Sequence, residues 1–352
     1  MKDFFSLLEA AVAGGALDLY LFEGYPVRIR AGGSLQTIRP KPLGGDELRT
    51  MLEPVVPSAG WTKLKDGGEV CFSFALRDKA RVRCVLFRHA QGLGASLRLF
   101  PLPLPELSSL GLPAEFLQSL GEWSQGLVLV VGPTRSGKST TLASLAQELA
   151  RSASRHIVTL EKPIEWIVAP GKSIVSQREI PADVPSFALG LRELAYEDAD
   201  VAIVGSLDQA DSIVPAFRLA EQGVFVVGAL CTIAQPLAIL QRLMALFGER
   251  TRDQIRSLLS RQLRAILGQR LLPQSDGRGW VLLAEVVVFD ETARALLGEA
   301  RFEELARWLK ENRRDSSPSL RLSLEELATK GKIGLGEAKT ELVLLERSEQ
   351  WL

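Results

Sequence analysis

The chain has few histidines, few cysteines and no excess of charge. Of its 352 residues, two are histidine and three are cysteine, and 42 basic residues balance 42 acidic ones. Cys71, Cys84 and Cys231 lie far apart, so neither a four-cysteine zinc site nor a disulfide scaffold is indicated. Such cysteine usage is typical of the reducing cytoplasm, which is the expected compartment.

Two further absences restrict the possible partners. Because the formal net charge is +0, a nucleic-acid-binding surface spread over the molecule is not expected, and no nucleic-acid partner is predicted. No apolar run approaches the ~20 residues that a membrane-spanning helix needs. Any attachment to a membrane is therefore expected to be peripheral.

A glycine-rich stretch follows the apolar run 125–131. Residues 132–139 read GPTRSGKS and fit the pattern G-x-x-x-x-G-K-[ST], with a helical stretch after it. In such a loop, backbone N–H groups surround phosphate oxygens and the following helix N-terminus adds partial positive charge. Lys138 is expected to reach the β- and γ-phosphates of ATP, and Ser139 to place its hydroxyl on Mg²⁺. The predicted nucleotide-binding residues are Gly132, Pro133, Thr134, Arg135, Ser136, Gly137, Lys138, Ser139 and Thr140.

Composition and periodicity divide the chain into regions. Residues 1–100 have the strand and helix patterns of a small α+β domain, and the proline-rich stretch 101–113 is predicted to be a linker. Strands alternate with helices between 114 and 290, which predicts an α/β fold with a mostly parallel sheet between helices. The charged stretch 291–352 is predicted to be a helical C-terminal region, with two short helices separated at Gly331.

The order of these elements resembles the PilT-like retraction motors of type IV pili, within the secretion-ATPase superfamily. The likeness rests on ALDLYL (16–21), the arginine-containing strands 81–101, the loop 132–139, TLEKPIEW (159–166), VSQRE (175–179) and the run 255–273. In the family, the last of these matches the helix and turn that end the motor core. The resemblance implies a RecA-like core, a Per-Arnt-Sim-like N-terminal domain and a homo-hexameric ring. It also implies an inner-membrane pilus platform protein as partner, with the ring on the cytoplasmic side.

Retraction-type motors are favoured over assembly-type motors by a single N-terminal domain and by the lack of a four-cysteine insertion. A helix motif linked with retraction corresponds to residues 291–299. The chain keeps Arg294, Leu296 and Glu299 of this motif, but Gly298 stands where a second arginine is expected. This difference argues against retraction activity itself.

Several positions depart from the family pattern around the expected phosphates. Ser206 stands where a glutamate should follow the Walker B strand, and Lys162 follows Glu161 where the Asp box should have a second acid. A serine offers only a weak neutral oxygen, and a neighbouring cation would lower the basicity of Glu161. Asp208 lies at the phosphate end of the same strand, and whether it replaces the missing glutamate is left open.

The His box and the glycine-rich loop also differ. Val224 and Cys231 stand at the family's histidine positions, while His89 and His156 lie elsewhere. Cys231 is expected to be a buried small residue. Arg135 replaces a glycine at a position that often has positive φ, at a cost of about 1 kcal/mol. Because phosphoryl transfer depends on positioning and charge, these changes together predict weak ATP hydrolysis.

Some catalytic residues of the family remain. Glu161 could act as a general base, whereas Glu165 is expected to be a solvated side chain. By resemblance, Arg81, Arg83 and Arg98 would reach a nucleotide, often that of a neighbouring subunit, as arginine fingers. The alternative for these arginines is a solvated sheet face. Arg81 and Arg83 would share that face, because side chains along a strand repeat every two residues.

The sequence therefore leaves several functions open. The first is an ATP-binding hexameric subunit of a type IV pilus or type II secretion motor that hydrolyses poorly and acts as a regulatory or accessory ring, with an active paralogous motor ATPase as a possible partner. The second is an active retraction ATPase with altered catalytic residues. The third is a ring scaffold that does not use nucleotide.

Overall fold

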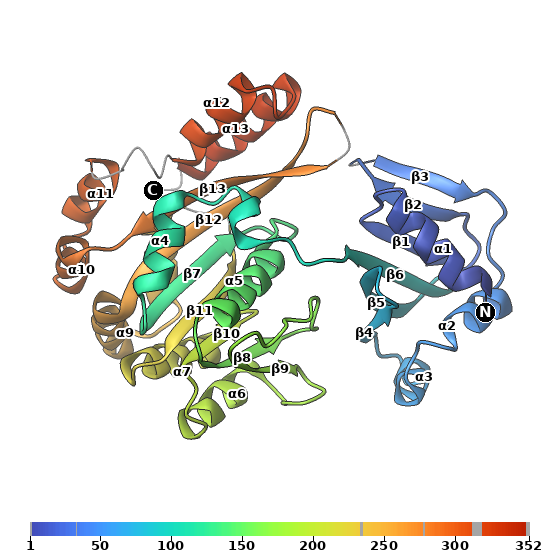
Figure 1. Ribbon diagram of the computed structural model, residues 1–352, viewed down its shortest axis with the longest axis horizontal. Helices are drawn as coiled ribbons and strands as arrows, with labels where there is room; N and C mark the ends of the chain where they lie inside the picture. The colour runs from blue at the N-terminus through green and yellow to red at the C-terminus, as the bar shows by residue number, and fades with distance from the viewer. Residues whose placement is uncertain (1, 33, 233–234, 277–278, 312–318, 350–352) are drawn as a thin grey trace. The chain divides into compact units, whose positions relative to one another are not determined.

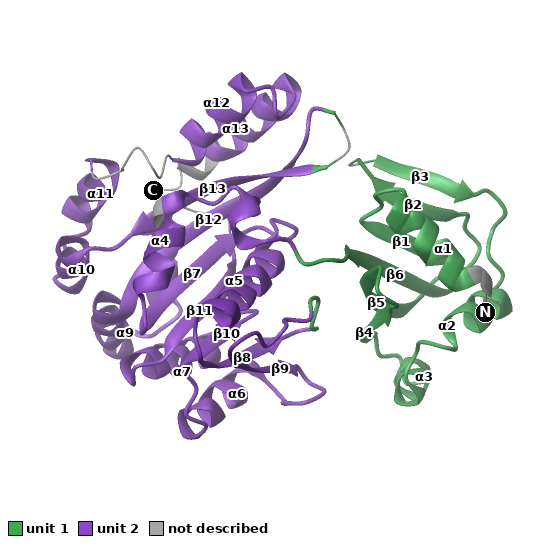
Figure 2. Cartoon of the chain, in the orientation of Figure 1, with its two compact units in different colours: residues 1–104, 163–166, 276–279 green, residues 105–162, 167–275, 280–352 purple. Residues whose placement is uncertain are grey.

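The computed structural model describes residues 2–32, 34–232, 235–276, 279–311 and 319–349 (Figure 1). The chain forms two compact units (Figure 2). Unit 1 comprises residues 1–104, 163–166 and 276–279, and unit 2 comprises residues 105–162, 167–275 and 280–352. The stretch 101–113, predicted to be a linker, is thus divided between the units after Leu104.

Unit 1 is a six-stranded antiparallel sheet with helices. Its strands are β1 (Asp18–Phe22), β2 (Val27–Ala31), β3 (Ser34–Arg39), β4 (Val70–Leu76), β5 (Ala80–His89) and β6 (Gly92–Pro101), in the order β3-β2-β1-β6-β5-β4. Its helices are α1 (Lys2–Ala13), α2 (Gly45–Leu52) and α3 (Ser58–Lys65). The strand β3 and the helix α3 carry weak periodic patterns, and the sequence did not predict them.

The alternation of residues along β5 determines which face of the unit 1 sheet is buried. Val82, Cys84 and Leu86 are fully buried, whereas the residues between them are partly exposed. Successive side chains of a strand point to opposite faces, so one face joins the core and the other carries the polar residues. The core side of the sheet packs on apolar residues of α1 such as Phe4 and Leu8.

Unit 2 is a seven-stranded sheet with helices between its strands (Figure 1). The strands are β7 (Gly126–Gly132), β8 (His156–Glu161), β9 (Ile174–Glu179), β10 (Val201–Val204), β11 (Phe225–Cys231), β12 (Leu263–Pro273) and β13 (Trp280–Val288). The helices are η1 (Leu107–Leu110), α4 (Ala114–Glu122), α5 (Lys138–Ser152), α6 (Phe187–Glu193), η2 (Leu194–Tyr196), α7 (Ala210–Glu221), α8 (Pro236–Ala245), α9 (Glu249–Gln262), α10 (Glu291–Gly298), α11 (Phe302–Glu311), α12 (Leu320–Thr329) and α13 (Leu335–Glu349).

The strand order of unit 2 is β13-β12-β7-β11-β10-β8-β9, and all neighbours are parallel except β12 and β13. Every residue of β7 and β10 is buried, as expected for a parallel sheet with helices on both faces. β11 separates β7 from β10. The predicted α/β fold with a mostly parallel sheet is confirmed, as is the α+β character of the N-terminal region.

One expectation for unit 2 is wrong. The run 255–273 was expected to be a helix followed by a turn, but α9 ends at Gln262 and the chain continues directly as β12. β12 lies between β7 and β13, so it is part of the central sheet. Its residues Ala265, Ile266 and Leu267 are nearly inaccessible to solvent, which explains why this segment lacks the one-sided pattern of a surface element.

The C-terminal helices belong to unit 2. α10 follows β13 directly and packs against α9, and its Asp290 N-cap accepts a hydrogen bond from the backbone N–H of Ala293. α12 and α13 pack on β12 and β13 through a small apolar cluster that includes Leu283 and Leu324. No helix formed by the described residues is both long enough and apolar enough to cross a membrane.

Candidate functional site

The glycine-rich loop lies at the carboxyl end of β7, an interior strand of the unit 2 sheet (Figure 1). Gly132 is the last residue of β7 and Lys138 is the first residue of α5. β7 pairs in parallel with β11 on one side and with β12 on the other, so the start of the loop is fixed from both sides. Ligands of parallel α/β sheets collect at this edge.

The two glycines of the motif are required by geometry. A Cβ at position 132 would lie 2.3 Å from the Gln269 carbonyl oxygen and 2.4 Å from Ser136 Oγ. Gly137 has φ +88° and forms the N-cap of α5. No larger residue fits at the first position without a shift of the backbone, and the second position has the left-handed conformation that glycine adopts most readily.

Arg135 has the left-handed conformation expected from its position in the loop. Its φ is 69°, which is uncommon for a non-glycine residue. The side chain is exposed. The chain therefore keeps the loop conformation but bears a strain of about 1 kcal/mol at this residue.

The loop and the start of α5 together fit a phosphate group. Lys138 Nζ donates hydrogen bonds to the carbonyl oxygens of Gly132 and Pro133, both at 2.8 Å, so the ammonium group spans the loop. The first N–H groups of α5 lack partners within the helix and carry the positive end of its dipole. Ser139 is exposed in the first turn of α5, beside this cluster of donors. Cation, backbone donors and hydroxyl are the groups that a metal-bound triphosphate requires.

Gln269 supports the loop from β12. Its Nε2 donates to the Ser136 carbonyl oxygen at 2.7 Å, and the residue is 1% exposed. The two residues are 133 positions apart in the chain. Sequence reasoning missed Gln269 because no local pattern marks it. Its proximity to the loop follows only from the pairing of β12 with β7.

Ser206 and Asp208 form a hydrogen-bonded pair beyond the end of β10. Ser206 Oγ donates to Asp208 Oδ2 at 2.8 Å. Asp208 Oδ1 accepts a hydrogen bond from the backbone N–H of Cys231 at 2.7 Å. The carboxylate therefore lies at the carboxyl ends of β10 and β11, the edge at which the glycine-rich loop begins, as expected for Asp208.

Cys231 lies directly beside the loop. As the last residue of β11 it pairs with Gly132, and its Sγ is 3.4 Å from Thr134 Oγ1. The expectation that Cys231 is buried is wrong, because the residue is exposed where β11 leaves the sheet. His156 begins β8, at the opposite end of the sheet from the loop, and His89 belongs to unit 1.

Glu161 ends β8 with a fixed carboxylate. Its Oε1 accepts hydrogen bonds from Thr159 Oγ1 at 2.7 Å and from Gln177 Nε2 at 2.9 Å. Gln177 Oε1 in turn accepts from the backbone N–H of Val168 at 2.9 Å. Lys162 is exposed. The side chain of Glu161 is thus held by β9 at the same edge of the sheet as Asp208, since β8 and β10 are parallel neighbours.

The three predicted arginines lie on one face of the unit 1 sheet. Arg81 and Arg83 alternate along β5, and Arg98 lies on β6 directly opposite Arg83. Like charges in opposed positions destabilise a sheet. Acids next to them offset this effect: Asp18 on β1 is opposite Arg98, and Glu165 pairs with Arg83.

The segment Pro163–Trp166, which belongs to unit 1, covers part of this arginine face. Arg81 Nε donates to the Ile164 carbonyl oxygen at 2.9 Å, and Arg83 Nη1 lies 2.6 Å from Glu165 Oε1. Glu165 is 9% exposed, so the expectation of a solvated side chain is wrong. Its burial is possible because Arg83 compensates its charge. The solvated sheet face considered for the arginines is likewise not observed for Arg81 and Arg83.

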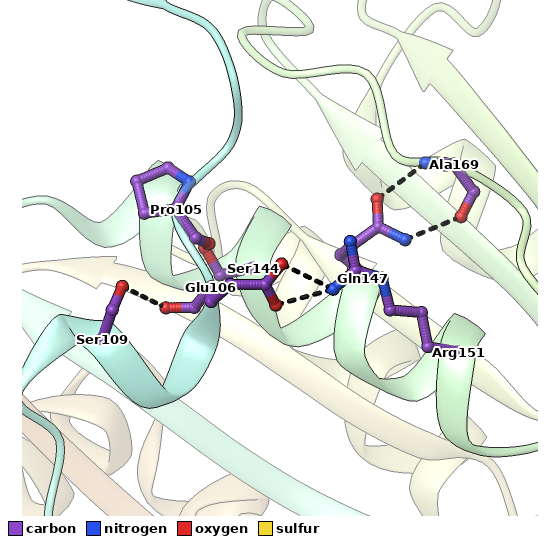
Figure 3. Close-up of polar contacts among 7 residues, drawn as sticks. All are labelled: Pro105, Glu106, Ser109, Ser144, Gln147, Arg151 and Ala169. Atoms are coloured by element: carbon purple, nitrogen blue, oxygen red, sulfur yellow. Dashed lines mark hydrogen bonds and ion pairs between the residues drawn. The ribbon is translucent and has the colours of Figure 1, made fainter.

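Within unit 2, the helix α5 binds two other stretches of the chain through its side chains, one at Glu106 and one at Ala169 (Figure 3). Arg151 Nη1 lies 2.7 and 2.6 Å from the two carboxylate oxygens of Glu106, near the start of unit 2. The Gln147 side chain forms paired hydrogen bonds with the backbone of Ala169, just after Trp166. The helix that begins at the glycine-rich loop therefore anchors both neighbouring stretches of the chain.

The next residue of β12 after Gln269 faces the C-terminal helices. Arg270 Nη1 lies 2.5 Å from Glu341 Oε1 on α13, and both side chains are less than 10% exposed. Burial raises the pKa of the Glu341 carboxyl, although the Arg270 guanidinium acts in the opposite direction. Glu285 Oε2 accepts a hydrogen bond from the backbone N–H of Leu320 at the start of α12. The Arg270 side chain thus links β12 to the C-terminal helix α13.

Comparison with known proteins connects this site to a family. The model of the family described as "Type II/IV secretion system protein" matches residues 25–293. The type IV pilus retraction ATPase PilT of Pseudomonas aeruginosa is 30% identical, over 98% of this chain and 99% of that protein. The type IV pilus ATPase PilU of the same organism is 29% identical, over 96% of this chain and 87% of that protein.

A solved structure of the pilus retraction motor PilT with bound ADP is similar over nearly the whole chain. It superimposes with a TM-score of 0.82 at 33% sequence identity and covers 95% of each chain. The likeness includes both the N-terminal domain and the core around the glycine-rich loop. The chain therefore belongs to the type II/IV secretion system protein family, and within it to the PilT-like ATPases.

Proposed function

We propose that the chain is an ATP-binding subunit of a type IV pilus or type II secretion motor that hydrolyses ATP poorly and acts as a regulatory or accessory ring. The observation that carries this proposal is the complete phosphate loop beside Ser206, which offers a neutral hydroxyl where the family has a carboxylate. Binding needs the loop, whereas rapid hydrolysis needs a full set of charges around the γ-phosphate. The relative PilT has been solved with ADP, which supports nucleotide use.

In this proposal the residues of the loop hold the nucleotide. Backbone N–H groups and Lys138 bind the phosphates, and Ser139 offers a hydroxyl to Mg²⁺. When bound, the metal neutralises phosphate charge. Thr134 and Arg135 lie at the exposed side of the loop, and Thr140 follows in the first turn of α5. In this proposal Arg81, Arg83 and Arg98 of unit 1 contact a nucleotide, often that of a neighbouring subunit, as arginine fingers. Arg81 and Arg83 also bind the segment Pro163–Trp166.

The proposed assembly is the one that the resemblance to pilus motors implies. We propose a homo-hexameric ring in the cytoplasm, bound peripherally to an inner-membrane pilus platform protein. An active paralogous motor is a further partner, since Pseudomonas aeruginosa has both PilT and PilU as relatives of this chain. No nucleic-acid partner is proposed. The regions 1–100, 101–113, 114–290 and 291–352 remain the proposed division of the chain by sequence, whereas the compact unit 2 includes both the core and the C-terminal helices.

An active motor is the second candidate. It is favoured by Glu161, whose carboxylate is held by Thr159 and Gln177 at the phosphate edge of the sheet. Such a group could act as a general base if a water were placed next to it. In that case Glu161→Gln would lower the turnover by orders of magnitude. A scaffold that does not use nucleotide is the third candidate, for which the strained Arg135 is the argument.

The test measures binding and turnover on the same purified chain. Calorimetric titration with Mg-ATP gives the affinity, and steady-state phosphate release gives the turnover. Lys138→Ala removes the phosphate-binding cation, and Lys172→Ala, an exposed lysine outside the loop, is the matched control. We expect binding at micromolar concentration, weakened about tenfold or more by Lys138→Ala but unchanged by Lys172→Ala.

Turnover separates the candidates. We expect wild-type turnover close to that of Lys138→Ala. Turnover far above this background, lost in Glu161→Gln, would replace the proposal by the active motor. Absence of any binding would replace it by the scaffold.

A further inference from the structure

The carboxylate of Asp208 is linked to the phosphate loop through a single residue of β11. Cys231 donates its backbone N–H to Asp208 Oδ1, pairs with Gly132 of the loop, and has its Sγ 3.4 Å from Thr134 Oγ1. The residue before Asp208 is held too, because the Leu207 N–H donates to the Ala229 carbonyl oxygen at 2.8 Å. Residues 207–208, which follow β10, therefore lie alongside the end of β11, and Cys231 at that end pairs with the first residue of the loop.

The environment of Asp208 leaves acceptor capacity for a ligand. A carboxylate has about four acceptor positions on its two oxygens. The Cys231 N–H occupies one position on Oδ1 and the Ser206 hydroxyl occupies one on Oδ2. The residue is exposed at the edge where phosphates would bind, so donors from the described residues leave acceptor positions of its carboxylate for a ligand.

The serine at the family's glutamate position thus orients an acid two residues further on. Two fixed donors hold the Asp208 carboxylate, one on each oxygen. Mg²⁺ usually keeps several waters and is held in proteins through one or two carboxylates together with phosphates. A fixed carboxylate at this edge can accept hydrogen bonds from the waters of such a metal ion, which restricts its position.

We propose that Asp208 supplies the carboxylate that holds hydrated Mg²⁺ at the phosphate loop, with Ser206 as the residue that positions it. This inference rests on the proposed function, namely that the chain binds a nucleoside triphosphate. It concerns binding of the metal–nucleotide complex and requires no hydrolysis. It explains how a chain without the glutamate retains a metal-dependent nucleotide site.

A simpler role for Asp208 is to cap the Cys231 N–H at the end of β11. Asp208→Asn distinguishes the two roles, because the amide oxygen keeps the hydrogen bond to Cys231 while the negative charge is lost. A capping residue would tolerate this change. A residue that holds the metal would not, because an amide is a much weaker acceptor for waters bound to a divalent cation.

The experiment compares nucleotide affinity with Mg²⁺ and with EDTA, using the full-length chain and a fluorescent ATP analogue. For wild type we expect tighter binding with Mg²⁺. Asp208→Asn should lower the ratio of the two affinities about tenfold. In EDTA the variant should bind as tightly as wild type or more tightly, since a negative charge near the phosphates has been removed. Asp211→Asn, an equal charge change on α7, is the matched control and should keep the wild-type ratio.

Two further variants keep the test decisive. Ser206→Ala keeps the carboxylate but removes its hydroxyl donor, so the ratio should fall only a few-fold. Ser206→Glu combined with Asp208→Asn returns a carboxylate to the family's position and should restore the magnesium dependence. A wild-type ratio in Asp208→Asn would overturn the inference while leaving the proposed function intact, and a wild-type ratio in Ser206→Ala would overturn the positioning role of Ser206. Failure of wild type to bind with or without Mg²⁺ would overturn both.

Discussion

Arg83 and Glu165 form an ion pair of 2.6 Å between residues 82 positions apart in the chain. The arginine is on β5 and the glutamate is in the short segment Pro163–Trp166, which begins two residues after Glu161. The side chains are 30% and 11% exposed, so water screens the pair only in part. Trp166 of the same segment packs edge-on against Phe100, with ring centroids 5.7 Å apart.

Arg83→Ala should destabilise unit 1, because it leaves the Glu165 carboxylate buried without its cation. We expect a loss of about 2 kcal/mol, less than for a fully buried pair because Arg83 is partly exposed. The measurement is hydrogen exchange of the β5 amides in increasing urea, which reports the unfolding of this unit. Lys79→Ala is the control: it breaks a pair of the same length with Glu9, but the lysine is 48% exposed. A loss below 1 kcal/mol is expected there, and equal losses in the two variants would contradict the prediction.

Gly132→Ala should disrupt the phosphate loop. The new Cβ would lie 2.3 Å from a backbone oxygen of β12, which cannot move without shifting the central sheet. We expect a loss of about 3 kcal/mol in stability together with loss of nucleotide binding. Thermal unfolding and calorimetric titration measure the two effects. Gly121→Ala in α4 is the control: nothing lies within 4 Å of its added Cβ, and we expect unchanged binding and a gain of about 0.5 kcal/mol. Unchanged binding in Gly132→Ala would show that the loop adapts.

The buried pair Arg270–Glu341 should respond to mutation as a unit. Arg270→Met leaves the Glu341 carboxyl buried without a cation, and we expect a loss of about 3 kcal/mol at neutral pH. The double variant Arg270→Met, Glu341→Met should recover to within about 1 kcal/mol of wild type, because apolar side chains of similar volume avoid the cost of desolvating two charges. Urea unfolding of the core measures both. A double variant as unstable as the single one would exclude this account.

The same pair predicts a pH dependence. Burial raises the pKa of Glu341 above its ordinary value of 4.5. When the pKa of a carboxyl is higher in the folded protein than in the unfolded chain, protonation of that carboxyl stabilises the fold. This stabilisation is complete below the ordinary pKa and is lost as the pH rises through the raised pKa. Without Arg270 the pKa of Glu341 should rise further. The loss of stability in Arg270→Met relative to wild type should therefore be smaller at about pH 5 than at about pH 8, as measured by urea unfolding at each pH. An equal deficit at both would contradict it.

The cysteines should differ in their reaction with iodoacetamide. Cys84 is fully buried, and desolvation raises the pKa of its thiol to about 12. Little thiolate is present near neutral pH, so Cys84 should remain unmodified until the chain unfolds. Cys71 and Cys231 are exposed and should react. Mass spectrometry of the labelled peptides measures the rates, and bound nucleotide should slow only Cys231, which lies beside Thr134. Labelling of Cys84 at the rate of Cys71 would contradict its burial.

Local features of the fold and the site could be predicted from the sequence. The glycine-rich loop, its strand and its helix were recognisable because the motif and both flanking patterns are contiguous. The position of Asp208 at the phosphate edge also followed from local order, since residues after a parallel strand lie at that edge. Its hydrogen bond to Ser206 joins residues only two positions apart.

Features that depend on distant pairing could not be predicted. The segment 263–273 has apolar residues at both helical and strand spacing, and only its place between β7 and β13 decides for a strand. The contacts of Gln269 with Ser136 and of Arg83 with Glu165 join residues far apart in the chain. No local pattern distinguishes Glu165 from a solvated glutamate. The burial of its charge follows from an arginine on another strand.

The neighbours Gln269 and Arg270 on β12 also bear on how the protein can be dissected. One side chain supports the phosphate loop and the next requires Glu341. A fragment that stops at residue 290 would keep the entire glycine-rich loop yet expose a guanidinium and an apolar strand surface that α12 and α13 cover in the full chain. Such a truncation would aggregate or misfold for reasons unrelated to nucleotide. The C-terminal helices are therefore a structural part of the unit 2 core, although they follow it in the sequence.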